Sequence, residues 1–301
     1  MLKWSPWTWI NTAAWRPTTV KKNSIDVSQP ALIRAAREAV AGAIAGDFPV
    51  DPLVGQEMSR ALSCIGSVVK RHGSIIELGI TAALLASDRF IVLPSVAIPL
   101  TKAALQLLDA KNTDETLSRV KLSADSEAAG IVNVDLVVVD PEAGWAGAYE
   151  IKRGNGVTEH GKRRPIMRKL RAIRPVLASY VHKLGYGPIE TVTSAVIDYY
   201  GASGFDPAFS ITRDKLDEHF GVAVTGTVET MTAAVREALT DELPRLFEPV
   251  FDRMTQPDHV SGLPNPGTAT LGIFARTAAA AATVPPIGPG KRRPRGFQAR
   301  H

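Results

Sequence analysis

The sequence predicts an α/β fold, in which a central mixed β-sheet is flanked by helices, with helical additions at both ends. The main evidence is a hairpin pattern: a Val-rich run over 131–140, a turn at 141–144, and a second strand-like run over 146–153. A helical pattern over 167–184 and another strand pattern over 191–200 follow the hairpin. Helical patterns also occupy both sides of this core.

The elements before the hairpin are predicted from their caps and breakers. Ser28 and Pro30 are typical of a helix N-terminus, and Gly73 separates two apolar helical runs. The residues at 110–130 are polar and predict a connection. The elements expected before the hairpin are helices over 31–45, 55–70, 74–87 and 101–109, and a strand over 89–98. After the core, we expect helix over 228–254, interrupted near Pro244 and Pro249.

The chain divides by pattern into four regions. Residues 1–66 form a Trp-rich and helical start, 67–205 the core, 206–257 a helical region, and 258–301 a basic tail. The tail is rich in Pro, Gly and Ala, so we expect it to be disordered. The tryptophans near the N-terminus favour packing on the protein's own core, with an aromatic platform for bases as the alternative.

Composition excludes several classes of protein. Hydrophobic residues make up 45% of 301, which is enough for a packed core and excludes a wholly disordered chain. The single cysteine, Cys64, excludes a disulfide framework and a Cys-based zinc cluster, and it suits a reducing compartment. The longest apolar stretch, 91–108, is broken by Pro94, Pro99 and Lys102, so no membrane span is expected. Without a signal-peptide pattern, we expect a cytoplasmic protein.

Positive charge is concentrated in two segments. Residues 151–183 contain ten basic residues and one acid, which gives +9, and residues 259–301 carry +6 with no acid. Because the whole chain has a net charge of +5, the remainder sums to −10. An acidic body with basic segments indicates a polyanion-binding protein. The alternative is a solvated, Arg-rich helix face with an extended tail.

The hairpin places charged residues together at one end. If the turn is centred between residues 142 and 143, paired residues have numbers that sum to 285, so Asp135 lies opposite Glu150. Lys152 and Asn133 point to the same face. We expect the other face to carry apolar side chains for packing, namely Val132, Val134, Leu136, Val138, Tyr149 and Ile151.

Two carboxylates this close repel each other, and a divalent cation relieves the repulsion. Oxygen ligands suit Mg²⁺, with Mn²⁺ as a substitute, and such a cation can activate water and polarise a phosphoryl group. Lys152 could orient that water or neutralise charge that develops on a phosphate. The alternative is a surface ion cluster of Asp135, Glu150 and Lys152 that contributes under about 1 kcal/mol.

The order of elements strengthens the metal interpretation. Glu77 is the one charged residue in the apolar helix over 74–87, and a lone carboxylate there needs a partner, unless it faces solvent in the first turn. Helix with Glu77, strand, strand with Asp135, strand with Glu150-Ile151-Lys152, basic helix and strand: this succession resembles the PD-(D/E)XK nuclease superfamily, which has the restriction-endonuclease-like fold. The resemblance covers about 70–200, and Val134 stands where the family name has proline.

The resemblance implies roles for these residues. Asp135 and Glu150 would hold the metal, Ile151 would supply a backbone carbonyl, and Glu77 would assist directly or through water. Lys152 would act on the nucleophilic water. The basic residues near the active edge would contact DNA phosphates: Arg153, Lys162, Arg163, Arg164, Arg168, Lys169 and Arg171.

The sequence therefore predicts a Mg²⁺-dependent endonuclease of the restriction or defence type that hydrolyses double-stranded DNA and forms a homodimer to cut both strands. A recombination or branched-DNA nuclease is the nearest alternative. Two further alternatives are a non-catalytic DNA-binding or assembly protein that retains the fold, and an interaction module that uses the Trp-rich start and the basic tail.

Overall fold

The computed structural model describes residues 25–255 of the 301-residue chain. The Trp-rich segment at 1–24 and the whole of the predicted basic tail lie outside the described residues. Contacts divide the chain into two compact units at Leu246, and the whole sheet belongs to the first unit.

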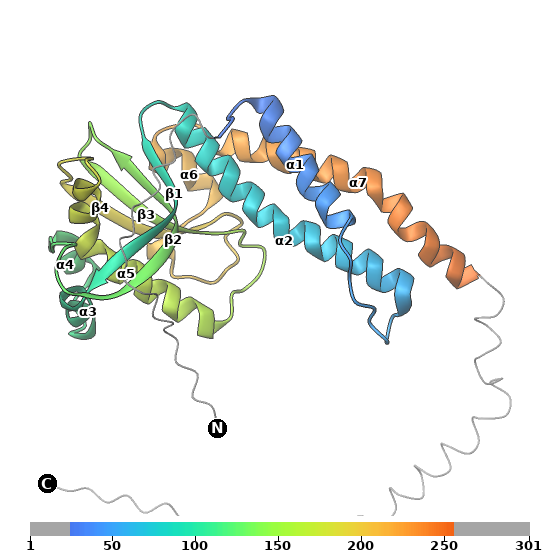
Figure 1. Cartoon of the computed structure of the whole chain (residues 1–301), viewed down its shortest axis with the longest axis horizontal. Coiled ribbons are helices and arrows are strands. Elements are labelled where there is room, and N and C mark those ends of the chain that lie inside the picture. Colours follow the sequence, from blue (N-terminus) through green and yellow to red (C-terminus); the bar gives the residue numbers. More distant parts are fainter. Residues whose placement is uncertain (1–24, 256–301) are drawn as a thin grey trace, which may run out of the picture. The chain divides into compact units, whose positions relative to one another are not determined.

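The core of this unit is a five-stranded mixed sheet with the strand order β1-β2-β3-β4-β5 (Figure 1). The first three strands pair antiparallel, and β3–β4 and β4–β5 pair parallel. This confirms the predicted α/β class with a mixed central sheet. The strands are β1 (Ile91–Thr101), β2 (Ala128–Asp140), β3 (Trp145–Lys152), β4 (Thr191–Asp198) and β5 (Ser210–Ile211).

Helices cover both faces of the sheet. They are α1 (Gln29–Ile44), α2 (Gly55–Ala86), α3 (Lys102–Asp109), α4 (Asp114–Arg119), α5 (His160–Lys183), α6 (Arg213–Phe220) and α7 (Thr225–Thr255), with one 3-10 turn at Pro207–Phe209. On one face, α3, α4 and α5 bury Leu108, Leu117 and Ile173 against the sheet. On the other face, α2 and α6 bury Ile80 and Phe220 against it.

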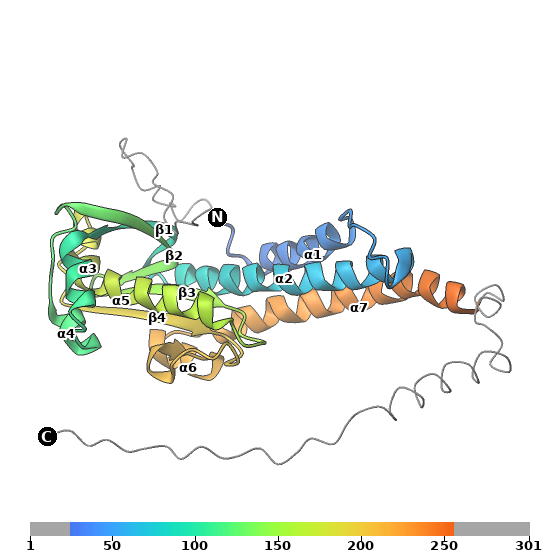
Figure 2. The same cartoon turned by 90° about the horizontal axis from the view of Figure 1, so that it is seen from below.

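A third apolar core joins α1, α2 and α7. Val40 of α1, Val68 of α2 and Met231 of α7 are buried together in it. Figures 1 and 2 both show the three helices side by side. The helix α2 therefore belongs to two cores: Val68, Ile75 and Ala82 pack in this bundle, and Ile76, Ile80 and Leu84 pack on the sheet.

The length of α2 differs from the prediction of two helices separated at Gly73. The structure has one helix of 32 residues that passes through Gly73. Glycine costs about 1 kcal/mol in a helix interior. Burial of Val68 before this glycine and of Ile76 after it outweighs that cost, because tertiary packing supplies most helical stability in proteins.

Prolines and short elements account for the other differences. The helix α5 begins at His160, seven residues before the predicted start, and contains Pro165 and Pro175. Likewise, α7 runs without a break through Pro244 and Pro249, near which the sequence predicts interruptions. The short helix α4 lies within the predicted polar connection, and α6 was not predicted. The helix α4 has 6 residues and one buried side chain, and α6 has 8 residues and two, so neither gives a clear periodic signal in the sequence.

No helix in the part of the chain that the structure describes is both long and apolar enough to cross a membrane.

Candidate functional site

The site is built where β2 and β3 separate. The turn at 141–144 pairs Asp140 with Trp145, and the register runs to Leu136 opposite Tyr149. This is the register that the sequence predicted. Beyond that pair, β2 stays bonded to β1 and β3 stays bonded to β4 as far as Lys152. Asp135 and Glu150 are the next residues on the two strands, so they stand at the point of separation, which we call the fork.

The backbone of β1 is unusual beside the fork. Pro94 pairs with Leu136 and Val96 pairs with Val134, which places Ser95 across from Asp135. Ser95 has a left-handed backbone with a φ of 52°, a conformation that non-glycine residues seldom adopt.

The buried side chains of β2 change face at the same point. Leu136 and Val138 pack in the core beneath α2, whereas Val132 and Val134 pack in the core beneath α5. The prediction that all of these residues share one face was therefore wrong. The prediction assumed that side chains alternate between the two faces along the whole of β2. The alternation shifts at Asp135, beside the left-handed backbone of Ser95, which the sequence pattern does not indicate.

Short polar contacts hold the fork residues together. The backbone N–H of Ile151 donates to Asp135 Oδ2 at 2.6 Å. Lys152 Nζ donates to Glu150 Oε1 at 2.7 Å and to the carbonyl of Ile151 at 3.2 Å. The same ammonium lies 3.8 Å from Asp135 Oδ2. Four predicted site residues thus converge: Asp135, Glu150, Ile151 and Lys152.

A second lysine enters the site from α5. Lys169 Nζ donates to the other oxygen of Glu150, Oε2, and to the carbonyl of Asn133 at 2.7 Å. The sequence predicted Lys169 as a contact to DNA phosphates; the structure places it on the carboxylate instead. Helical spacing is a signal for this position, because it puts Lys169 on the side of α5 that carries the buried Ala172, Ile173 and Val176.

Glu77 lies on α2 near the same carboxylates and is half-buried. Burial raises the pKa of Glu77, and the negative charge of Asp135 raises it further, with a smaller contribution from Glu150. Lys152 acts in the opposite direction. The structure thus brings Glu77 within electrostatic reach of the fork.

The two fork carboxylates differ in their electrostatics. Burial raises the pKa of Asp135, and the charge of Glu150 adds to this, against the bond from Ile151 N–H and the two lysines. Burial also opposes ionisation of Glu150, but its hydrogen bonds from Lys152 and Lys169 outweigh that effect and bring its pKa below the usual value. Glu150 is the more enclosed group, with 10% of its side chain exposed against 31% for Asp135.

The donor set suits a hard divalent cation. Asp135, Glu150 and the Ile151 carbonyl supply oxygen ligands, and Glu77 adds a third carboxylate nearby. Burial first, and then the charge of the neighbouring carboxylates, raise the pKa of Glu77 and Asp135, and a bound cation would favour the ionised form of both groups. Within residues 25–255, no three His, Cys, Asp or Glu side chains are yet grouped closely enough to hold an ion. The fit is therefore to the Asp135–Glu150 pair with the carbonyl.

An open hollow of about 700 Å³ adjoins the fork. One wall is Lys152, and the others come from the loop after β3 and the first turns of α5. The lining residues are Lys152, Val157, Thr158, Glu159, Gly161, Lys162, Pro165 and Ile166. The hollow thus gives Lys152 access to solvent and to a ligand.

Several of the predicted DNA contacts have acidic partners. Arg168 pairs with Asp109 at 2.8 Å, and Arg171 pairs with Asp114 at 2.6 Å. Lys162 pairs with Glu159 at 3.2 Å. The net charge summed over residues 151–183 does not include Asp109 and Asp114. Both belong to the segment at 102–130, which folds back against α5.

Three predicted contacts form no ion pair with another described residue. Arg153 donates to His72 Nδ1 at 3.0 Å and lies over the Tyr200 ring. Arg163 donates to the carbonyl of Gly204, and Arg164 is exposed at the start of α5. Positive charge that is free for a ligand therefore concentrates near the N-terminal end of α5.

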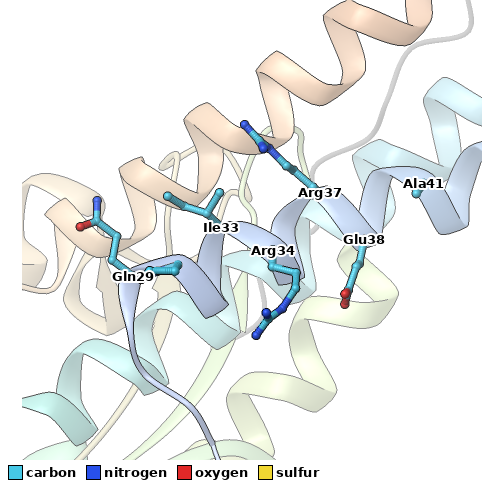
Figure 3. Close-up of a pocket in the computed structure, with 7 residues that line it drawn as sticks. Gln29, Ile33, Arg34, Arg37, Glu38 and Ala41 are labelled. Atoms are coloured by element: carbon cyan, nitrogen blue, oxygen red, sulfur yellow. The ribbon is translucent and has the colours of Figure 1, made fainter.

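A second hollow, of about 590 Å³, lies along α1 (Figure 3). Arg37 reaches toward α7, where it pairs with Glu237 at 2.8 Å, while Arg34 and Glu38 point to another side of the helix. Its described lining comes from α1 alone, and no cluster of polar groups converges there. We assign no chemistry to this surface.

Compared with known proteins, the chain matches no family model, no curated sequence and no solved structure.

Proposed function

We propose that the protein is a metal-dependent endonuclease that hydrolyses phosphodiester bonds of double-stranded DNA, with a restriction-endonuclease-like core of the PD-(D/E)XK type. The observation that carries the proposal is the convergence of Asp135, Glu150 and Lys152 at the fork beside an open hollow. Carboxylates and an ammonium at this spacing suit the reaction of water with a phosphate diester.

The chain's own residues would divide the work as follows. Asp135 and Glu150, with the Ile151 carbonyl, would hold Mg²⁺ or Mn²⁺, which when bound supplies a polarised phosphoryl group and an acidified water. Two hydrogens of the Lys152 ammonium are engaged by Glu150 and Ile151. The third is free to hold the attacking water or a phosphate oxygen in the hollow.

The hollow supports the choice of a polyanionic substrate. Lys152 lines it, as does Lys162, which shares its charge with Glu159 of the same lining, and the exposed Arg164 lies on the same early part of α5. Phosphates that flank the scissile bond would bind these cations and fix its position, without reading the base sequence.

The test is cleavage of a plasmid and of a random-sequence duplex pool by the purified full chain, with Mg²⁺, Mn²⁺ or EDTA. Asp135→Asn and Lys152→Met should each reduce the cleavage rate by at least about 100-fold, because each removes a group that acts on the reacting phosphate. Glu237→Gln, which removes a surface carboxylate of α7, is the matched control and should cleave like the wild type.

Cleavage that persists in Asp135→Asn, or that is unaffected by EDTA, contradicts the proposal. The product pattern adds a second result. Nicked circles that accumulate before linear DNA indicate that one site acts on one strand at a time, whereas direct linearisation indicates that two chains act together.

One observation favours a second candidate, a non-catalytic DNA-binding or assembly protein with the same core. Both oxygens of Glu150 accept hydrogen bonds from lysines, so the ammonium groups already balance the charge that a cation would balance. Salt-dependent binding of the whole duplex pool, with no cleavage in Mg²⁺ or Mn²⁺, would select this candidate.

A further inference from the structure

Lys169 differs from the other basic residues of α5 because its ammonium crosses the fork. It donates to the carbonyl of Asn133 on β2 and to the carboxylate of Glu150 on β3. Its side chain is 18% exposed, whereas that of Arg168, its neighbour in sequence, is 47% exposed. Lys169 is therefore part of the site and not of the solvated face of the helix.

We propose that Lys169 is a positioning residue that holds Glu150 across the fork and competes with the divalent cation for the Glu150 carboxylate. This inference rests on the proposed function, because the cation belongs to it. In physical terms, Lys169 sets how tightly the site binds metal.

The first step of the argument is mechanical. The β2–β3 ladder ends at Leu136 and Tyr149. Beyond it, Ile151 N–H bonds to Asp135, and the Lys169 ammonium bridges the two strands. An ammonium shared between a backbone oxygen and a carboxylate fixes the position of Glu150 relative to β2, where Asp135 lies.

The second step concerns charge. Lys152 occupies Oε1 of Glu150 and Lys169 occupies Oε2. A cation that ligates Glu150 must share or replace one of these ammonium groups, and two cations that share one carboxylate repel each other. Each lysine would keep a backbone carbonyl as a partner, but that of Lys152, on Ile151, is itself a proposed ligand of the cation, whereas that of Lys169, on Asn133, is not. Lys169 is therefore the ammonium that the cation replaces.

The test measures Mn²⁺ binding to the full chain by titration calorimetry, in the absence of DNA. Lys169→Met removes the competing charge, so Mn²⁺ should bind about tenfold more tightly. Lys169→Arg keeps the charge, so it should not show the gain in affinity of Lys169→Met. Lys183→Met is the matched control: it makes the same change on the same helix, but Lys183 pairs with the exposed Asp125.

The outcomes separate this inference from the proposed function. Equal or weaker Mn²⁺ affinity in folded Lys169→Met, or an equal gain in Lys183→Met, overturns the competition and leaves the nuclease proposal standing. A purely structural role would weaken binding, not strengthen it. Absence of Mn²⁺ binding in both wild type and Lys169→Met overturns both proposals.

If Mn²⁺ binds to Lys169→Met but not to the wild type, the competition is supported. The same result contradicts the proposal that the wild-type protein holds the metal. Circular dichroism verifies the fold of each variant. If Lys169→Met does not fold, Lys169→Gln retains a donor for Asn133 and carries the same comparison.

Discussion

His72 is a buried imidazole held by two named partners outside the fork. Arg153 Nε donates to its Nδ1 at 3.0 Å, so the ring proton resides on Nε2 and is donated to Thr232 Oγ1 at 3.0 Å. Burial lowers the pKa of His72, and the adjacent Arg153 charge lowers it further. A second proton would have to occupy the nitrogen that faces the guanidinium. The folded state therefore favours the neutral ring.

This arrangement predicts a pH dependence of stability. The unfolded chain binds a proton at His72 below about pH 6.5, whereas the folded chain resists it, so the free energy of unfolding falls as pH drops below that value. Urea unfolding at pH 7.5 and 5.5 measures the loss. His72→Gln should lose less stability over this interval than the wild type, because glutamine does not titrate.

His182→Gln is the matched control, since His182 is exposed on α5. Its loss of stability between the two pH values should equal that of the wild type. An equal loss in His72→Gln would show that His72 is protonated in the folded protein and would contradict the assignment of its ring proton.

At the site, the sequence predicted the residues of the hairpin but not those that reach it from elsewhere. The Asp135–Glu150 juxtaposition follows from the length of one turn, because the turn fixes every pair in the ladder. Lys169 reaches Glu150 only through the rotation of α5 on the sheet, which depends on tertiary packing. The left-handed backbone of Ser95 has no sequence signature, since glycine or asparagine usually mark such positions.

At the scale of elements, α2 offers two glycines with opposite surroundings. A Cβ built on Gly73 meets no atom within 4 Å. On Gly79, a Cβ would lie 3.0 Å from Val228 Cγ2 and 3.2 Å from Val228 Cα, which belongs to the backbone of α7. Gly79 therefore sets the approach of α7 to α2, whereas Gly73 only interrupts the helical pattern.

Replacing the two glycines by alanine should change the free energy of unfolding in opposite directions. Gly73→Ala should raise the free energy of unfolding by about 0.5–1 kcal/mol, because alanine restricts the unfolded chain and favours helix. Gly79→Ala should lower it by about 1–3 kcal/mol, because the backbone of α7 must shift. Urea unfolding of both variants against the wild type measures the changes, and a loss of stability in Gly73→Ala would contradict a continuous α2.

Elements with a long apolar period were predictable, and their interruptions were not. The strands β2, β3 and β4 and the helix α1 lie within a few residues of their predicted bounds. The sequence predicts breaks at Gly73, Pro244 and Pro249 from the intrinsic cost of these residues in a helix. Each lies inside a helix because the flanking turns bury apolar residues. Local propensity is weaker than tertiary packing at these three positions.

For the molecule as a whole, the charge map in space differs from the charge map in sequence. The segment at 151–183 is strongly basic as a sequence, but acids from the segment after β1 lie against it in the fold: Asp109, Asp114 and Asp125 pair with Arg168, Arg171 and Lys183. Much of the basic charge expected to bind a polyanion is therefore paired with acidic side chains of the same chain. The basic residues of this segment that have no acidic partner among the described residues are fewer, and they lie near the start of α5.

The salt dependence of DNA binding tests this map. In EDTA, to prevent cleavage, fluorescence anisotropy with a labelled duplex gives the slope of log affinity against log salt concentration. Arg164→Ala removes a cation that is unpaired among the described residues, so the slope should become shallower by about 1.

Arg168→Ala makes the same change four residues along α5, but Arg168 is neutralised by Asp109. Its slope should change by much less, because few counterions are released from a phosphate that meets an already paired arginine. Equal changes of the slope in the two variants would mean that DNA displaces Asp109 from Arg168 and that the whole basic face of α5 binds DNA.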